Sequence, residues 1–283
     1  MNAIPSLPRL RTFVETINQP LRMPGGVTSR SIREDGIRVE WVEGPHASSE
    51  SVVMYVHGGA WVLGWYKNHR VLAAHIGRSS GCRVLAVDYR LAPEDPFPAS
   101  LHDCLAAYEW LLKNGFEPNR IVIAGDSAGA NLALAVLQTL RDAGETLPAA
   151  VVCISPMTDL ACTGDTFHTD KDALLTAEFA LSMSSQYTGG RDARLPLISP
   201  QYGDMTGLPP MLIHAGEDEI LLSDARRLAE KARKAGVDVT LKVWPGMWHV
   251  WHIFVPFLPE AVDAVAEIGG FIRRHADRTT EGD

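Results

Sequence analysis

The most informative stretch of the sequence is Ile121-Val-Ile-Ala-Gly125-Asp126-Ser127-Ala128-Gly129. An apolar run typical of a buried strand leads directly into Gly-x-Ser-x-Gly, and an Ala- and Leu-rich segment of helical character follows. A strand-to-helix turn this sharp strains the backbone of Ser127 and crowds its neighbours, which explains glycines at 125 and 129. The strand-before, helix-after context favours a nucleophilic serine at a helix N-terminus over an ordinary Gly-Ser turn.

Short apolar runs alternate with amphipathic segments of helix length on both sides of this motif. Such alternation predicts an α/β fold with a mostly parallel central sheet flanked by helices on both faces. Expected strands are 51–56, 83–87, 121–124, 150–154, 211–214 and 239–243, and their apolar character suits burial on both faces. Expected helices are 68–79, 101–114, 131–143, 223–235 and 260–275. Upstream, 27–32 and 37–42, joined by Glu34-Asp35-Gly36, predict a β-hairpin.

Two segments stand outside this alternation and predict a helical cap. Residues 10–21 place Leu10, Phe13, Val14 and Ile17 at helical spacing, so this short helix should cover something apolar. Residues 155–210 are too long for a simple connection, and 173–187 within them look helical, so this mid-chain insertion resembles a lid. We therefore expect a single domain over residues 1–283 with cap elements at about 1–25 and about 160–205, and a frayed tail from Thr279.

Composition excludes several classes of function. The 283 residues carry 26 Lys and Arg against 34 Asp and Glu, a net charge of -8 with no basic run, which disfavours nucleic-acid or anionic-membrane binding. No apolar run reaches the roughly 18 residues of a membrane span, and residues 1–25 lack the pattern of a signal peptide, so we expect a cytoplasmic protein. Cys82, Cys104, Cys153 and Cys162 form no CxxC pair and are interpreted as reduced thiols, mostly in the core. Neither metal-ligand spacing nor a dinucleotide loop is present, so no cofactor and no metal are expected.

A second motif, upstream, suits the stabilisation of an oxyanion. Val52-Val-Met-Tyr-Val-His57-Gly58-Gly59-Ala60-Trp61 is a strand followed by a pair of glycines. Acyl transfer needs donors aimed at a developing negative charge, and the backbone of a Gly-rich loop can approach closely. We expect the N–H groups of Gly58, Gly59 and Ala128 to fill this role. His57 could be a base or a metal ligand, but we interpret it as ordering the loop.

A serine nucleophile needs a base, and the base needs an acid that orients it. Among ten histidines, His249 follows an expected strand in Trp244-Pro-Gly-Met-Trp-His249, where its loop would reach the carboxyl edge of the sheet. His252 is the rival, and His214 falls inside an expected strand. The acid should follow the preceding strand, where Glu217, Asp218, Glu219 and Asp224 crowd one turn. Asp224 or Ser223 is a plausible helix N-cap, and one of the other carboxylates should face the histidine.

Four motifs in this order resemble the bacterial hormone-sensitive-lipase-like (family IV) carboxylesterases, a branch of the α/β-hydrolases. They are His57-Gly-Gly-Ala-Trp61, Asp88-Tyr-Arg-Leu-Ala-Pro-Glu94, Gly125-Asp-Ser-Ala-Gly129 and Gly246-Met-Trp-His249, and the resemblance covers roughly residues 27–274. It implies the α/β-hydrolase fold, Ser127 as nucleophile, His249 as base, and the loop at Gly58 and Gly59 completing the oxyanion hole. The resemblance also implies a structural role for Asp88–Glu94, where Arg90 and Glu94 could pair with each other or with nearby loops. We expect structural roles for Asp126 and Asn131 as well.

The sequence departs from that family at two positions. Ala60 replaces the third glycine of His-Gly-Gly-Gly, which leaves the backbone donors intact. The family acid is usually the aspartate of Asp-Pro-Leu-x-Asp, and an ungapped count back from His249 puts Glu219 there, whereas Asp218 needs a shift of one residue. We predict Glu219 as the acid and Asp218 as the alternative.

These residues predict a serine carboxylesterase that hydrolyses short-to-medium acyl esters through an acyl-serine intermediate, with activity falling below neutral pH as His249 protonates. Lactones, aryl esters and carbamates stay open as substrates. Rival interpretations are a non-catalytic ligand receptor on the same fold, a peptidase or amidase with the same triad, and a protein–protein scaffold. The expected partner is a small ester, and an edge strand such as 239–243 could pair two copies into a homodimer. Candidates to line the substrate pocket are Phe13, Trp61, Trp65, Phe167, Phe179, Trp248 and Trp251.

Overall fold

The computed structural model describes residues 6–34 and 36–276, so the predicted turn residue Asp35 and the predicted frayed tail from Thr279 lie outside the described residues. One eight-stranded sheet runs through the molecule in the order β1-β2-β4-β3-β5-β6-β7-β8. Its strands are β1 (Thr28–Glu34), β2 (Ile37–Glu43), β3 (Ser48–Val56), β4 (Cys82–Val87), β5 (Ile121–Asp126), β6 (Ala150–Ile154), β7 (Met211–Gly216) and β8 (Val239–Trp244).

The sheet is mostly parallel, as the alternation of strands and helices predicts. β1 pairs antiparallel with β2, and β2 pairs antiparallel with β4, which gives the expected hairpin at one edge. From β4 to β8 every neighbouring pair is parallel. The loops that follow these strands therefore meet at one edge of the sheet.

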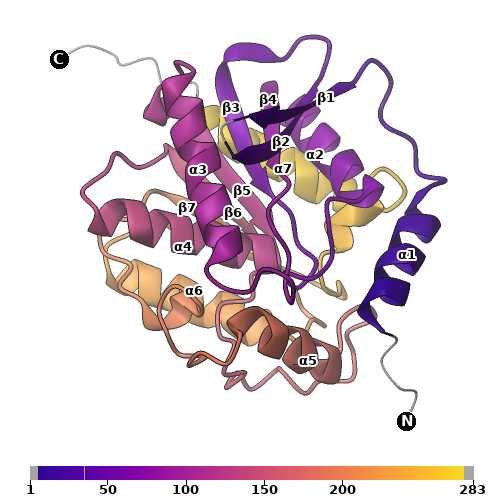
Figure 1. Ribbon diagram of the computed structural model, residues 1–283, viewed down its shortest axis with the longest axis vertical. Helices are drawn as coiled ribbons and strands as arrows, with labels where there is room; N and C mark the ends of the chain where they lie inside the picture. The colour runs from indigo at the N-terminus through magenta and orange to yellow at the C-terminus, as the bar shows by residue number, and fades with distance from the viewer. Residues whose placement is uncertain (1–5, 35, 277–283) are drawn as a thin grey trace.

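Helices cover both faces of the sheet (Figure 1). α2 (Lys67–Ser80) and α7 (Pro259–Ala276) pack on one face, and α3 (Ala99–Lys113), α4 (Ala128–Asp142) and α6 (Leu222–Lys234) pack on the other. Two further helices, α1 (Leu7–Asn18) and α5 (Ala177–Thr188), come from the two predicted cap segments and lie beyond the rim of the sheet. The short 3-10 turns are Pro118–Arg120, Pro200–Tyr202 and Trp251–Phe254.

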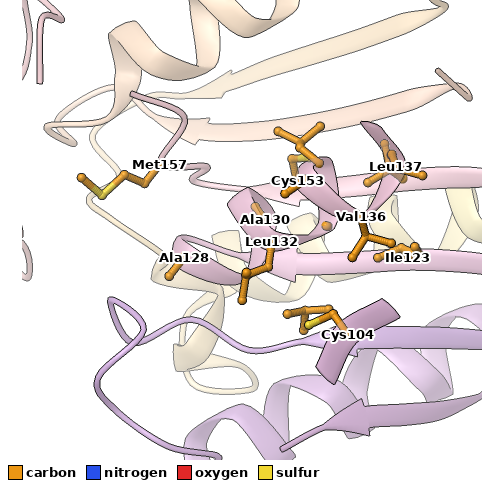
Figure 2. Close-up of a cluster of buried hydrophobic side chains, with 14 of the residues drawn as sticks. Cys104, Ile123, Ala128, Ala130, Leu132, Val136, Leu137, Cys153 and Met157 are labelled. Carbon is orange, nitrogen blue, oxygen red and sulfur yellow. The ribbon is translucent and has the colours of Figure 1, made fainter. Parts of the chain in front are cut away.

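α4 is the most deeply enclosed helix, since all ten residues from Ala128 to Leu137 are buried. Figure 2 shows side chains of this helix beside Ile123 of β5 and Cys153 of β6. Small residues in its first turn let it approach the sheet closely: a Cβ atom at Gly129 would collide with the carbonyl oxygen of Val56. This approach places the N-terminus of the helix at the carboxyl edge of the sheet.

Several boundaries differ from the predicted ones for local reasons. α4 begins directly after Ser127 rather than at 131, because the nucleophile turn leads into the helix without a linker. α5 begins at Ala177 rather than 173, since the Thr176 side chain caps it by accepting from the Phe179 N–H at 3.3 Å. The N-cap of α6 is Leu221, not Ser223 or Asp224.

The edge strand β8 is not buried on both faces as predicted. Its first five residues alternate between half-buried and exposed, because only one face is covered there, and Trp244 at its end is buried. α1 likewise has no fully buried residue, and Phe13 and Ile17 stay 60% and 54% exposed. The apolar stripe of α1 therefore covers the core only through residues such as Val14, which lines a pocket described below.

Candidate active site

Ser127 lies at the turn between β5 and α4 with a strained backbone. Its φ angle is +52°, a conformation that costs a non-glycine residue about 1–3 kcal/mol. The turn is held because the Ser127 N–H donates to the carbonyl oxygen of Ile154 at 2.8 Å. Gly125 is required next to it, since a Cβ atom there would lie 2.5 Å from the backbone of Gly129. The steric reasoning applied to the Gly-x-Ser-x-Gly sequence thus matches the geometry of the turn.

His249 lies opposite this serine. Its Nε2 is 2.9 Å from Ser127 Oγ, a hydrogen bond between residues 122 positions apart in the chain. The loop that carries it is held from behind, because the Val250 N–H donates to Ser155 Oγ at 3.1 Å. An imidazole at this distance can accept the hydroxyl proton.

The rival histidine, His252, points elsewhere. It is fully buried, and its Nε2 lies 3.2 Å from Nδ1 of His214, also fully buried. Burial lowers the pKa of both rings, that of His214 to about 3, so the pair stays neutral. His214 is a core histidine, as its place in the strand pattern predicts.

The four carboxylates of the turn after β7 separate into different roles. Glu219 Oε2 lies 3.7 Å from His249 Nδ1, within ion-pair range but longer than a hydrogen bond. Asp218 instead faces Lys171 at 3.8 Å. Glu217 accepts from the Gly246 N–H, and Asp224 accepts from the N–H groups of Thr158 and Asp159. Of the two predicted acids, only Glu219 is oriented toward the histidine.

The environment of Glu219 is unusual for a carboxylate. The side chain is fully buried, and neither oxygen has a hydrogen-bond partner among the described residues. Burial raises the pKa of Glu219, while the imidazole of His249 and the hydroxyl of Ser155 partly offset that rise. The neighbouring imidazole is thus the principal group available to stabilise the charged form.

The predicted oxyanion donors do not all point toward Ser127. The Gly58 N–H donates at 2.9 Å to Asp126 Oδ1, which also accepts from the Tyr55 hydroxyl at 2.6 Å. Gly58 is therefore occupied, and its predicted role as an oxyanion donor is not met. In the described part of the chain, the N–H groups of Gly59, Ala60 and Ala128 donate to no protein acceptor. The Ala60 N–H is therefore available beside that of Gly59, whereas the Gly58 N–H is not.

His57 packs behind this loop. Its ring stacks on Tyr89, with centroids 4.2 Å apart, and its carbonyl oxygen accepts from the Tyr89 hydroxyl at 2.9 Å. Burial lowers the pKa of His57 to about 3, so the ring is neutral. These contacts fit the interpretation that His57 orders the loop.

A small cavity of about 170 Å³ opens at Ser127 and His249. Its walls come from widely separated segments and are mostly apolar: Val14, Gly59, Ala60, Leu63, Tyr66, Asn68, His69, Asp126, Leu174, Leu175, Phe179, Val250 and Ile253. Among the predicted aromatic candidates only Phe179 lines it. Trp61, Trp65, Phe167 and Trp251 are buried in the core, Trp248 is half-buried outside the cavity wall, and Phe13 is exposed.

The helices of both predicted cap segments are attached to the core by specific contacts. The Arg11 guanidinium of α1 donates to the carbonyl oxygens of Val62 and Ala92 and pairs with Glu94 at 2.7 Å. Tyr187 of α5 stacks on Trp61, with centroids 4.3 Å apart. Glu94 thus pairs with α1, whereas Arg90 pairs with Asp103 at 2.7 Å.

Four contributors to the site were not predicted from the sequence. Asp126, taken as scaffolding, orients Gly58. Ser155 holds the base loop, Arg11 holds α1, and Asp172 accepts from the His249 N–H at 3.3 Å. Only Asp126 stood within a recognisable motif. The other three bind backbone groups of distant segments, and Arg11 also pairs with the Glu94 carboxylate. Such contacts leave no periodicity or spacing to detect.

The described residues contain no cluster of His, Cys, Asp and Glu that could hold a metal ion. The four cysteines have free thiols; Cys82, Cys104 and Cys153 are buried and Cys162 is half-buried. In residues 6–34 and 36–276, no helix has the length and apolarity needed to cross a bilayer.

Comparison with known proteins places this geometry in a family. Residues 53–253 match the family described as alpha/beta hydrolase fold. An esterase of the bacterial hormone-sensitive lipase family has a solved structure that superposes with a TM-score of 0.94 at 44% identity, covering 97% of this chain and 93% of that one. The chain is an esterase of this family.

Sequence relatives of the esterase agree with this assignment. The acetyl-hydrolase of Streptomyces hygroscopicus is 49% identical over 83% of this chain and 79% of its own length. An esterase of Acinetobacter venetianus is 38% identical over 87% of this chain and 82% of its own. The predicted fold and family are confirmed.

Proposed function

We propose that the esterase hydrolyses short acyl esters through an acyl-serine intermediate formed on Ser127. The observation that carries the proposal is the 2.9 Å contact between Ser127 Oγ and His249 Nε2, at the floor of an apolar cavity. Glu219 completes the triad as the acid that holds the imidazole. Its carboxylate faces His249, while that of Asp218 faces Lys171, which supports Glu219 over Asp218.

The reaction follows from these positions. His249 Nε2 accepts the hydroxyl proton as Ser127 Oγ attacks the ester carbonyl, and the resulting imidazolium is stabilised by Glu219. The imidazolium then protonates the departing alcohol, which leaves an acyl-serine. A water molecule gives its proton to His249 and its hydroxide to the acyl carbon, and Ser127 regains its proton as the acid is released.

The proposed oxyanion hole comprises the N–H groups of Gly59, Ala60 and Ala128. All three lie beside Ser127 in sequence or along the cavity wall, and none donates to another described residue. Ala128 is also the first residue of α4, so the partial positive charge of the helix N-terminus adds to its donor. Asp126 positions the loop by holding Gly58.

The size of the cavity supports short acyl chains. Its volume of about 170 Å³ is close to that of engineered cavities that admit a molecule as small as benzene. That space suits acyl chains from acetyl to about hexanoyl. The relative from Streptomyces hygroscopicus is named an acetyl-hydrolase, which agrees with the shortest of these chains. The cavity walls also support a single domain in which residues up to about 25 and about 160–205 act as a cap, since Val14 and Phe179 contribute to them.

Hydrolysis of p-nitrophenyl acetate, butyrate, octanoate and palmitate by wild type and Ser127→Ala tests the proposal. Wild type should prefer acetate or butyrate, and removing the serine should lower kcat by about 10⁴- to 10⁶-fold. Equal activity of wild type and Ser127→Ala, or no hydrolysis of any of the four, contradicts the proposal.

The same assay separates the rival functions. A peptidase or amidase would hydrolyse the matched p-nitroanilides at rates comparable to the esters. A receptor or a scaffold would hydrolyse neither set. We expect ester hydrolysis only.

A further inference from the structure

Asp172, in the cap insertion before α5, accepts hydrogen bonds from three separate segments of the chain. Its Oδ1 accepts from the N–H groups of Leu174 and Leu175 at 3.0 and 3.2 Å. The same oxygen accepts from the His249 N–H at 3.3 Å. Its Oδ2 accepts from the Ile220 N–H at 3.1 Å. One half-buried carboxylate therefore satisfies four backbone donors.

Each of these donors belongs to a part of the proposed reaction centre. Leu174 and Leu175 form part of the wall of the cavity at Ser127. Ile220 directly follows Glu219, the proposed acid, and the third segment is the base His249 itself. A displacement of Asp172 would therefore shift the acyl-binding wall, the acid and the base at the same time.

Other contacts join the insertion to the turn after β7, but none of those described next involves His249. Lys171 pairs with Asp218 at 3.8 Å, and Thr166 Oγ1 donates to the Ile220 carbonyl oxygen at 2.9 Å. Within the described residues, Asp172 is the insertion residue whose side chain binds the backbone of His249. Its role is thus different from that of a simple tether between the cap and the core.

We propose that Asp172 is a positioning residue that couples the acyl-pocket wall to the base and acid of the triad. The inference rests on the proposed function, since it takes Ser127, His249 and Glu219 as the reacting groups. A carboxylate suits this task because its two oxygens offer several lone pairs in one plane, so one side chain can fix three segments at once. The relative position of these three segments matters because a misplacement of about 1 Å in a catalytic group can lower the rate by about 10²-fold.

The test compares wild type with Asp172→Ala, Asp172→Asn and the control Asp170→Ala. Asp170 is exposed two residues earlier in the same loop, so the control removes a nearby charge without removing these contacts. Each variant is assayed on p-nitrophenyl acetate, butyrate and hexanoate. Each is also titrated with a p-nitrophenyl alkylphosphonate, which releases one nitrophenolate for every serine it phosphonylates. The burst amplitude counts competent sites, and the rate constant reports how well each site is aligned.

Asp172→Ala should lower kcat on all three esters by about 10- to 100-fold. The phosphonylation rate per competent site should fall by a similar factor, and the preference between acetate and hexanoate should change because Leu174 and Leu175 are released. Asp172→Asn keeps an acceptor at Oδ1 but places an NH₂ group toward the Ile220 N–H. It should lose less rate and keep the chain-length preference. Asp170→Ala should match wild type within threefold.

Three results would overturn the inference. One is a phosphonylation rate per site that stays within threefold of wild type, even if the burst amplitude falls, because that indicates a purely structural role. Another is a lower rate with an unchanged chain-length preference in Asp172→Ala, which contradicts the coupling. The third is an equal loss in Asp170→Ala. If Asp172→Ala does not fold, the phosphonylation rate per site of Asp172→Asn decides, and a value within threefold of wild type overturns the inference. Failure of the proposed function is distinguishable, because Ser127→Ala would then be as active as wild type.

Discussion

Glu219 is fully enclosed by protein and lacks a hydrogen-bond partner among the described residues, so the His249 imidazole is the principal group that stabilises its charge. Glu219→Gln removes that charge while keeping the shape of the side chain. We expect kcat on p-nitrophenyl butyrate to fall by about 10³- to 10⁴-fold, because the imidazole loses both its orientation and its counter-charge. Asp218→Asn, which alters only the partner of Lys171, should stay within threefold. The reverse order would make Asp218 the acid.

Glu219→Gln, which should lower kcat, should at the same time make the folded protein more stable relative to wild type as pH rises. Burial raises the pKa of Glu219, so above the ordinary carboxyl range the folded protein keeps a proton that the unfolded chain has released. This proton uptake favours the folded state at lower pH, and the advantage is lost as pH rises through the raised pKa. Glu219→Gln has no such loss. The difference in Tm between Glu219→Gln and wild type should therefore grow in favour of the variant from pH 5 to pH 8. A difference that shrinks over this range would contradict the assigned burial cost.

Ala60 occupies a backbone conformation that favours glycine, with φ at +53°. The left-handed region costs a non-glycine residue about 1–2 kcal/mol, which is partly offset because glycine loses more entropy on folding. Ala60→Gly should therefore raise the free energy of unfolding by about 0.5–1 kcal/mol in urea titrations. Since the backbone donor is retained, kcat on p-nitrophenyl acetate should stay within threefold. A destabilised Ala60→Gly would mean that the Ala60 methyl packs more favourably than the strain costs.

At the scale of elements, α1 is held to the core largely through one side chain. The helix has no fully buried residue, and Arg11 makes four hydrogen bonds to Val62, Ala92 and Glu94. Arg11→Ala should release α1 and with it Val14, which lines the cavity. We expect KM for p-nitrophenyl butyrate to rise about three- to tenfold with kcat changed less, because the reacting groups do not touch α1. Arg9→Ala, on the exposed side of the same helix, should leave both constants unchanged. An unchanged KM in Arg11→Ala would show that α1 does not shape the cavity.

The predictability of this site depends on how each residue is held. Ser127 and His249 could be located from the sequence because the turn and the loop after β8 each impose a local pattern of glycines and apolar residues. The helices and strands could be located for the same reason, since their periodicity is local. Gly58 was misassigned because its donor is taken by Asp126, 68 residues away, and local sequence does not specify that partner. Asp172 was missed for the same physical reason, because its four partners are backbone groups that any residue type could supply.

At the scale of the whole molecule, the cavity is built by segments that meet only on folding: Val14 from α1, Leu174 and Leu175 from the insertion, Phe179 from α5 and Ile253 after the base. Its volume of about 170 Å³ therefore depends in part on side chains of α1, the insertion and α5. Phe179→Ala removes a whole phenyl ring from this wall, so the preferred acyl chain should lengthen from acetyl or butyryl toward hexanoyl or octanoyl. Leu181→Ala, two residues on and 46% exposed, should leave the preference unchanged. The ratio of kcat/KM for octanoate over acetate measures this shift, with an expected rise of about tenfold or more, since each buried CH₂ contributes about 0.8 kcal/mol. A ratio that stays constant in Phe179→Ala would place the acyl chain on another side of the cavity.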